Sequence, residues 1–108
     1  MATGLRITIP TQLVLQTLLA DPERELYGME VGEQAGLRSG TVHPILARLE
    51  SVGWLASRWE DIDPRTEGRP ARRYYRLTAE GAPAAQAALA SAHRPPPARR
   101  LRPQVGEA

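Results

Sequence analysis

Apolar residues recur in steps of three and four along the first half of the chain, a spacing that predicts amphipathic helices. The predicted helices cover about residues 11–20, 27–35 and 40–52. Between the last two, Gly36 suits the left-handed position after a helix C-terminus, and Ser39 is a favourable N-cap. A helix, a short turn that contains glycine and another helix form the layout of a helix-turn-helix.

The second half of the chain has the pattern of a β-hairpin. Residues 54–60 and 71–77 are predicted strands, and the Asp-Pro and Gly-Arg-Pro turn signals in residues 61–70 predict a long tip between them. Alternation along the second strand puts one set of side chains on each face: Arg73, Tyr75 and Leu77 on the first, and Arg72, Tyr74 and Arg76 on the second. One face can therefore pack while the other presents guanidinium groups.

The third predicted helix has an unusual outer face. Its inner stripe is apolar: Val42, Ile45, Leu46, Leu49 and Val52. The opposite side is small in the middle and able to form hydrogen bonds at its edges: Gly40, Pro44, Ala47 and Ser51, flanked by Thr41, His43 and Arg48. A proline in the second turn of a helix costs less than one farther in. A helix of this shape fits a DNA major groove, which is about 12 Å wide.

Charge is distributed unevenly along the chain. Residues 1–57 hold four arginines against six acidic residues, whereas residues 58–108 hold ten arginines against six. All 14 basic residues are arginine, whose guanidinium group suits phosphate and guanine contacts. Arg69, Arg72 and Arg73 therefore form a basic cluster beside the third helix. The alternative is a solvated hairpin that its own acidic residues partly neutralise: Glu60, Asp61, Asp63 and Glu67.

Other kinds of chemistry find little support. The chain has no cysteine, and its two histidines, His43 and His93, lack the spacing of metal ligands. No phosphate-binding glycine loop is present, and the carboxylates of the hairpin tip are expected to be solvated. We therefore expect no enzyme activity, no metal and no cofactor. With no signal-peptide pattern and no segment that could span a membrane, the expected location is the cytoplasm.

Four sequence stretches carry a resemblance to a known family. They are Glu-Leu-Tyr-Gly-Met-Glu-Val at residues 25–31, Gly-Leu-Arg-Ser-Gly-Thr-Val-His-Pro-Ile-Leu-Ala-Arg-Leu-Glu at 36–50, Gly-Trp-Leu at 53–55 and Gly-Arg-Pro-Ala-Arg-Arg-Tyr-Tyr-Arg-Leu-Thr-Ala-Glu-Gly at 68–81. Over about residues 11–82 the chain closely resembles the PadR family of bacterial transcriptional regulators. The resemblance implies a homodimer on a palindromic operator, with the third helix in the major groove and the wing on the minor groove or backbone. It also implies repression that a small aromatic or other hydrophobic ligand relieves.

The chain departs from the family pattern in two places. His43 stands where the family usually has tyrosine, so the contact made there can differ in chemistry. The C-terminal helix, through which the family largely dimerises, is here short, rich in alanine and followed by three prolines. Dimerisation can instead rest on the first helix and the segment before it, through Leu5, Ile7 and Ile9.

The sequence thus predicts an α+β, mostly α-helical fold, a winged helix-turn-helix with a short C-terminal helix. The expected organisation is an N-terminal arm (1–10), a DNA-binding domain (11–77), a short C-terminal helix available for dimerisation (78–93) and an Arg/Pro-rich disordered tail (94–108). The expected partners are double-stranded DNA, a second copy of the chain and a small aromatic effector, with no membrane.

The residues expected at the DNA fall into three groups. Thr41, His43 and Arg48 contact bases or adjacent phosphates beside the small residues Gly40 and Pro44; Ser39 and Tyr27 anchor the backbone; and Arg69, Arg72 and Arg73 hold the wing to phosphates. Two alternatives stay open. The winged helix could serve as a protein-interaction adaptor, or it could sense an aromatic compound between Trp54, Trp59 and the dimer contact.

Overall fold

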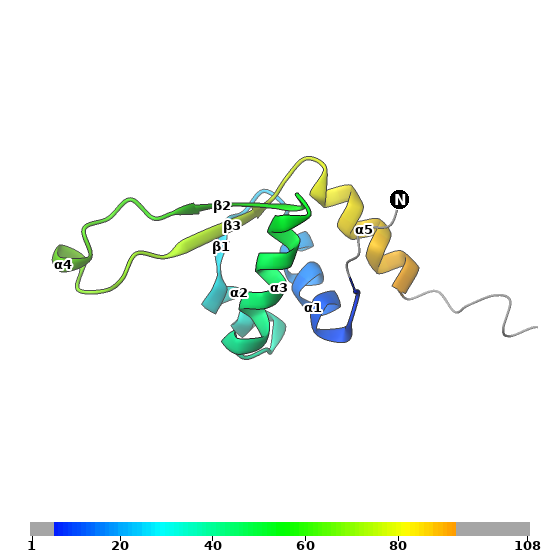
Figure 1. Cartoon of the computed structure of the whole chain (residues 1–108), viewed down its shortest axis with the longest axis horizontal. Coiled ribbons are helices and arrows are strands. Elements are labelled where there is room, and N and C mark those ends of the chain that lie inside the picture. The colour runs from blue at the N-terminus through cyan, green and yellow to red at the C-terminus, as the bar shows by residue number, and fades with distance from the viewer. Residues whose placement is uncertain (1–5, 93–108) are drawn as a thin grey trace, which may run out of the picture.

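The computed structural model describes residues 6–92 and shows a bundle of helices from which a β-hairpin projects (Figure 1). The elements follow in the order α1 (Ile9–Leu19), β1 (Leu26–Tyr27), α2 (Gly28–Ala35), α3 (Ser39–Ser51), β2 (Leu55–Trp59), α4 (Pro64–Glu67), β3 (Arg73–Leu77) and α5 (Gly81–Ala92). The predicted winged-helix fold class is confirmed. The expected tail at 94–108, His93 and Leu5 lie outside the described residues.

Helix α1 forms the centre of the core, as its broad apolar surface predicts. Val14, Leu15 and Leu18 are buried, and α1 packs against α2, α3 and α5. Full burial of such side chains contributes about 1.5–3 kcal/mol each. The helix begins two residues before the predicted start because extended Thr8 caps it, with its Oγ1 accepting a hydrogen bond from the N–H of Thr11 at 3.3 Å.

The turn between α2 and α3 is built around glycine. Gly36 has a φ of 73°, the left-handed conformation that the sequence predicts, and the N–H of Leu37 donates to the carbonyl of Gly32 at 2.8 Å. The prediction that Ser39 caps α3 is wrong. Arg38, with an extended backbone, occupies the N-cap, and Ser39 is the first helical residue, so no side chain caps this helix.

The sheet has three antiparallel strands in the order β1-β3-β2, one more than predicted. Strand β1 pairs Leu26 with Tyr75 and Tyr27 with Tyr74. At two residues, β1 is too short to show an alternating pattern, which is why the sequence does not reveal it. Strand β2 pairs with β3 from Leu55↔Leu77 to Trp59↔Arg73. Strand β3 is therefore hydrogen-bonded along both of its edges, to β1 and to β2.

The wing, which we define as residues 55–77, reaches away from the helices and carries the short helix α4 at its far end (Figure 1). Asp63 caps α4, with its Oδ1 accepting a hydrogen bond from the N–H of Arg65 at 3.0 Å. The alternation predicted for the second strand holds at its base, where Tyr75 and Leu77 are buried and Arg76 is exposed. The wing is therefore anchored by apolar side chains at its base.

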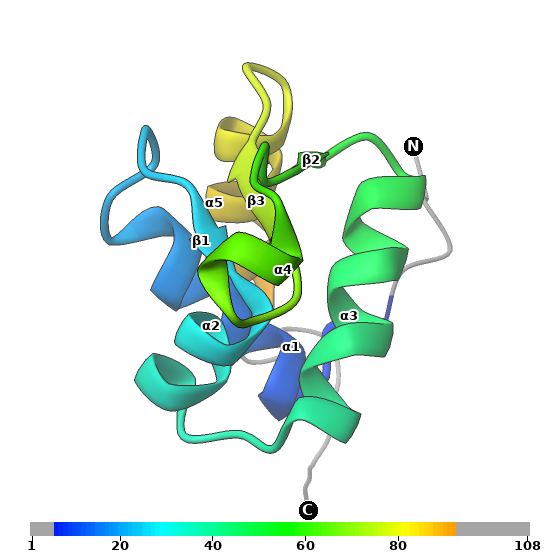
Figure 2. The same cartoon turned by 90° about the vertical axis from the view of Figure 1, so that its left-hand side faces the viewer.

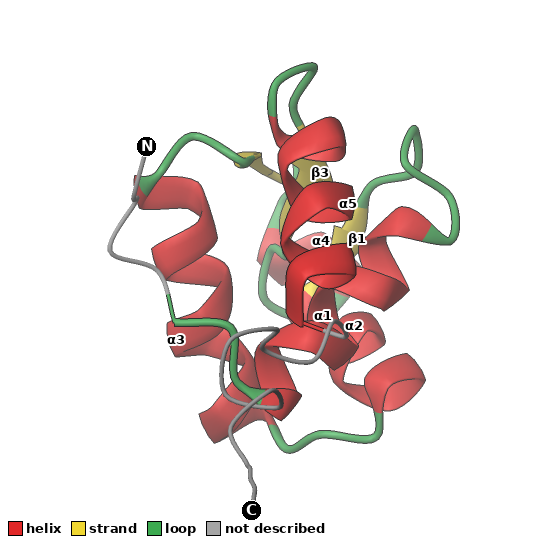
Figure 3. Cartoon of the chain, turned by 90° about the vertical axis from the view of Figure 1, so that its right-hand side faces the viewer, coloured by secondary structure: helices red, strands yellow, loops and turns green. Residues whose placement is uncertain are grey.

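Helix α5 closes the core on the side opposite the wing (Figure 3), where it packs against α1. Thr78 caps it, since its Oγ1 accepts a hydrogen bond from the N–H of Gly81 at 2.9 Å. A Cβ atom at residue 81 would collide with the backbone carbonyl of Trp54, so this crossing requires glycine. Among residues 6–92, none of the helices has the length and apolarity that a bilayer crossing requires.

Candidate nucleic-acid interface

The two faces of α3 divide as the sequence predicts. Val42, Ile45, Leu46 and Leu49 are buried against α1, α2 and β2. The outer face is open and made of small or hydrogen-bonding residues, all of them exposed: Ser39, Gly40, Thr41, His43, Pro44, Ala47, Arg48 and Ser51. Viewed along the wing, α3 runs along one side of the molecule (Figure 2). Most of its length is therefore free to approach a partner.

Two arginines of this helix surface carry charge that no carboxylate in residues 6–92 neutralises through an ion pair. Arg48 lies on the outer face of α3, and Arg38 occupies the N-cap of the same helix. Both side chains are exposed. Sequence reasoning identified Arg48 but missed Arg38. The available signal was its place directly before the helix, where a side chain stands beside unpaired backbone N–H groups.

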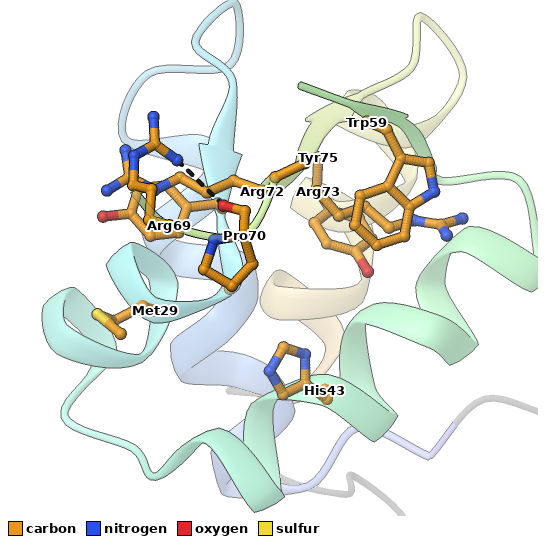
Figure 4. Close-up of a pocket in the computed structure, with 11 residues that line it drawn as sticks. Met29, His43, Trp59, Arg69, Pro70, Arg72, Arg73 and Tyr75 are labelled. Atoms are coloured by element: carbon orange, nitrogen blue, oxygen red, sulfur yellow. Dashed lines mark hydrogen bonds between the residues drawn. The ribbon is translucent and has the colours of Figure 1, made fainter. Parts of the chain in front are cut away.

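His43 projects from α3 toward α2 and the base of the wing (Figure 4). Its ring lies against the backbone of Gly28, because a Cβ atom at residue 28 would come within 2.7 Å of His43 Cε1. The position of the imidazole therefore depends on the absence of a side chain at residue 28. This contact explains one of the glycines near the start of α2.

Tyr27, expected to anchor DNA, is also part of a stack of aromatic rings and guanidinium groups. Its ring meets that of Tyr74 edge to face at 5.6 Å, and the guanidinium of Arg72 lies 4.4 Å from its centroid. The guanidinium of Arg58 covers Tyr74 at 5.3 Å. Contacts of this kind contribute about 0.5–1 kcal/mol each at exposed sites. They hold Arg72 against the body of the protein without neutralising its charge.

Arg69 is paired within the wing. Its two terminal nitrogens donate to the two carboxylate oxygens of Glu60 at 2.8 and 2.9 Å, and the backbone N–H of Arg72 donates to Glu60 Oε1 at 3.1 Å. The hydrogen bonds from Arg69 lower the pKa of the Glu60 carboxyl to about 2. The expectation that Glu60 is simply solvated is therefore wrong, because the chain folds back between them and brings Arg69 to its carboxylate.

Arg73 connects the wing to α3. Its Nε donates to Ser57 Oγ at 3.0 Å, Ser57 Oγ donates to Glu50 at 2.6 Å, and its Nη2 lies 3.5 Å from Glu50 Oε1. The Arg73 guanidinium also lies 5.3 Å from the ring of Trp59. These contacts link the last turn of α3 to both strands, so they help to set the angle between α3 and the wing.

The wing holds two more arginines that the sequence did not single out, Arg58 in β2 and Arg65 at the tip. Arg58 donates to both carboxylate oxygens of Glu25, at 2.8 and 2.7 Å, and this hydrogen bonding lowers the pKa of the Glu25 carboxyl. Arg65 is exposed in α4, and among the described residues no carboxylate pairs with it. The tip of the wing thus carries a cation far from the helices.

A pocket of about 460 Å³ lies between the start of α2, His43 of α3 and the middle of the wing (Figure 4). Its walls combine aromatic, apolar and cationic side chains: Tyr27, Met29, His43, Trp59, Arg69, Pro70, Ala71, Arg72, Arg73 and Tyr75. Trp59 lines this pocket, but Trp54 does not, because it is buried in the core. The two tryptophans therefore do not enclose one site. Across residues 6–92, no group of three or more His, Cys, Asp or Glu side chains is arranged to hold a metal ion.

Solved structures of regulators share this fold. A PadR family transcription regulator from hypervirulent Clostridium difficile R20291 is 25% identical, with a TM-score of 0.60 over 78% of this chain and 86% of that one. The PcaV transcriptional regulator from Streptomyces coelicolor, solved with its natural ligand, is 32% identical, with a TM-score of 0.56 over 73% of this chain and 50% of PcaV. Reduced AbfR bound to DNA is 29% identical, with a TM-score of 0.59 over 84% of this chain and 61% of AbfR.

The chain spans 50% of PcaV and 61% of AbfR, so it corresponds to part of those proteins. A comparison with curated proteins finds no match. The family comparison matches residues 17–87, which include the helix-turn-helix and the wing, to the transcriptional regulator PadR-like family. Because this match covers more than half of the chain and the helices and wing are arranged as in a PadR family regulator, the chain belongs to the PadR-like family of transcriptional regulators.

Proposed function

We propose that the chain is a sequence-specific DNA-binding repressor that acts as a homodimer on a palindromic operator. The observation that carries this proposal is the open face of α3, where small residues lie between Thr41, His43 and Arg48 and all of these residues are exposed within the described part of the chain. Such a face lets the helix backbone approach the floor of a major groove while the flanking side chains reach base edges.

The residues of α3 divide by the contacts we assign to them. Thr41, His43 and Arg48 read bases, and Arg48 has the guanidinium that pairs with two acceptors of guanine. Ser39 and Arg38 lie at the helix N-terminus, where backbone N–H groups favour a phosphate. Tyr27 contacts the sugar-phosphate backbone of the DNA strand that carries this phosphate. Gly40 and Pro44 have no long side chains, so they let the backbone of α3 approach the floor of the major groove.

The arginines of the wing contribute mainly to affinity. Arg72 and Arg65 form no ion pair within residues 6–92, and we assign them direct contacts with phosphates. Arg73 spends two of its nitrogens on Ser57 and Glu50 and offers the third to a phosphate. Arg69 contributes least, because Glu60 occupies both of its terminal nitrogens. Each phosphate that is neutralised makes the slope of log affinity against log salt more negative by about 0.9.

Dimerisation places two copies of α3 in successive major grooves. We assign residues 11–77 to DNA binding and the helix at 78–93, together with the segment around Ile9, to the dimer contact. Ile9 is 66% exposed at the start of α1, and burying this apolar side chain against a partner would favour association. Half-sites about 34–36 Å apart, one helical turn, are then expected. A small aromatic effector relieves repression.

The test is fluorescence anisotropy with the DNA that flanks the gene, compared with a scrambled duplex of the same length and composition. We expect the flanking DNA to bind at least about a thousandfold more tightly at physiological salt, as specific sites do. Mass photometry of the complex would count two protomers. Equal binding to both duplexes would defeat sequence-specific recognition. No binding to either duplex in low salt would favour the protein-interaction adaptor.

A further inference from the structure

We propose that Glu50 is a positioning residue for DNA recognition: through Ser57 and Arg73 it determines which phosphate the wing contacts when α3 lies in the major groove. Glu50 itself need not touch DNA, because it acts through Arg73. The inference rests on the proposed function, since it concerns how α3 and the wing bind one duplex together.

The three side chains form a closed ring of polar contacts. Ser57 Oγ donates to Glu50 Oε2 at 2.6 Å and accepts a hydrogen bond from Arg73 Nε at 3.0 Å. Arg73 Nη2 lies 3.5 Å from the other carboxylate oxygen, Glu50 Oε1. Each member of the ring comes from a different element: α3, β2 and β3. Because the ring is closed, it restricts both the position and the plane of the Arg73 guanidinium.

The strand register places the wing members of this ring on one face of the sheet. Trp59 lies opposite Arg73 and Ser57 lies opposite Tyr75, and directly opposed residues of antiparallel strands share a face. The Arg73 guanidinium also lies 5.3 Å from the ring of Trp59 (Figure 4). Its remaining terminal nitrogen, Nη1, has no hydrogen-bond partner among residues 6–92, so this nitrogen is the one that can contact a phosphate.

Glu50 stands where a carboxylate is otherwise unfavourable. It is the one acidic residue of α3, and it lies in the last turn, where the helix dipole favours cations over anions. It follows His43 by about two helical turns, so both side chains lie on the same side of α3, next to the surface that we assign to DNA. A carboxylate there repels phosphates. Its contacts with Ser57 and Arg73 offset both costs.

A fixed geometry between α3 and the wing matters because the geometry of DNA is also fixed. Contacts to base edges set the register of α3, and the phosphates lie at defined places relative to those bases. A guanidinium that is already held at the matching place loses less conformational freedom on binding than a mobile one. Without the ring, Arg73 can reach several neighbouring phosphates, and its contact with each of them is weaker.

The test is ethylation interference on the DNA that flanks the gene, which shows at which phosphates an added ethyl group prevents binding. Arg73→Ala identifies the phosphate that Arg73 contacts, because interference there should disappear. In Glu50→Ala, interference at that phosphate should weaken and extend to its neighbours, whereas the phosphates beside α3 should keep theirs.

The affinities of E50A should change in opposite ways for two duplexes. By fluorescence anisotropy, the flanking duplex should bind about tenfold more weakly, the scale of one lost charge-assisted hydrogen bond. A scrambled duplex should bind as tightly as before or more tightly, because a negative charge near the phosphates has been removed. A variant that is merely less stable would lose affinity for both.

Ser57 offers a matched pair of variants. Ser57→Ala removes the hydroxyl and should reproduce the interference pattern of E50A, whereas Ser57→Thr keeps the hydroxyl, suits a strand and should keep the wild-type pattern. Glu33→Ala is the charge control, because Glu33 is exposed in α2 and forms no ion pair within residues 6–92. It should change the affinity for both duplexes by the same small factor. Urea unfolding establishes that the variants fold, and if E50A does not, the S57A and S57T pair decides.

Two outcomes would overturn the positioning role of Glu50 alone. One is an interference pattern in E50A and S57A that matches the wild type, and the other is an equal loss of affinity for the flanking and scrambled duplexes in E50A. If the wild type itself does not prefer the flanking DNA, the proposed function fails and this inference fails with it.

Discussion

The outer face of α3 and the arginines of the wing are both assigned to DNA, but they differ in their internal partners. On α3, Thr41, His43 and Arg48 are exposed, and Arg48 has no ion pair with any carboxylate of residues 6–92. On the wing, Arg58 and Arg69 each form two hydrogen bonds with a carboxylate. The exposed side chains of α3 can contact DNA without breaking a contact inside the protein. Arg58 and Arg69 of the wing must first exchange a carboxylate partner for a phosphate.

This difference separates specificity from affinity. Exposed ion pairs contribute about 0–1 kcal/mol, so phosphates can replace the carboxylate partners of the wing at little cost, and equally on any sequence. Contacts from α3 to base edges discriminate by about 1–3 kcal/mol per good pair. We therefore expect changes in α3 to alter which DNA is bound and changes in the wing to alter how tightly any DNA is bound.

The largest effect is expected from Ala47→Glu on the outer face of α3. A carboxylate placed in the groove faces the phosphates and base acceptors, and like-charge contacts cost several kcal/mol, so DNA affinity should fall by about a hundredfold or more. Residue 47 is exposed, so stability should change by less than about 0.5 kcal/mol. Anisotropy titration and urea unfolding measure the two quantities.

The control for A47E is Ala20→Glu, which adds the same charge at an exposed residue at the end of α1 that is assigned neither to a DNA contact nor to the dimer contact. That variant should bind DNA within about threefold of the wild type, because one distant surface charge is largely screened at physiological salt. Similar losses in A47E and A20E would mean that α3 is not the helix in the groove, and the comparison between helix and wing would have no basis.

A paired substitution gives the next largest effect and separates the two regions directly. Arg48→Ala should reduce the ratio of specific to random binding by about five- to a hundredfold, equivalent to about 1–3 kcal/mol of base discrimination. Arg72→Ala should weaken specific and random duplexes by the same factor and lower the salt slope by about 1. The measurement is a salt series with both duplexes. Two variants with identical ratios would contradict the division of roles.

The parts of the molecule that sequence predicts are those with a local cause. The two faces of α3 follow from a 3.6-residue period, and the positive φ of Gly36 follows from its place after a helix. The wing could be predicted as a hairpin because strand alternation and turn signals are also local. Strand β1 was not predicted, because two residues are too few to show the alternation of a strand.

What sequence could not predict depends on distant parts of the chain. Arg58 meets Glu25 across 33 residues, and no local pattern encodes that pair. In the sequence, Arg69 and Arg72 look equivalent. In the fold, Arg69 pairs with Glu60, whereas Arg72 lies over the ring of Tyr27 and keeps its charge. The pocket is formed by three separate segments that meet only in the folded chain. The sequence gives the number of arginines in the wing, and the structure shows which of them are paired with carboxylates.

A smaller effect tests how α2 positions His43 of α3. In Gly28→Ala the new Cβ would lie 2.7 Å from His43 Cε1, and the exposed imidazole should turn away at little energetic cost. Stability should therefore change by about 1 kcal/mol or less. Selection of bound sequences from a random library should show altered preference at the base pair that His43 reads. His43→Ala is the control, because G28A should have no further effect on preference in that background.

The smallest effect concerns the pairing of Arg69 with Glu60 in the wing. The pKa of Glu60 falls from its ordinary 4.5 to about 2, so the folded wing favours the ionised carboxylate. A lowered pKa stabilises the fold above pH 4.5 and loses this contribution as the pH falls toward 2. Glu60→Gln should therefore be less stable than the wild type at pH 6, and the difference should shrink progressively below pH 4.5.

Urea unfolding at a series of pH values measures that difference, with Glu67→Gln as a control that removes the same charge from the exposed wing tip. A difference between E60Q and the wild type that does not depend on pH would mean that Arg69 is not held by the ionised carboxylate. E60Q also sharpens the comparison with α3, because it frees the Arg69 guanidinium for phosphate. Affinity should rise by about the same factor for specific and random DNA, which places Arg69 with the sequence-independent contacts of the wing.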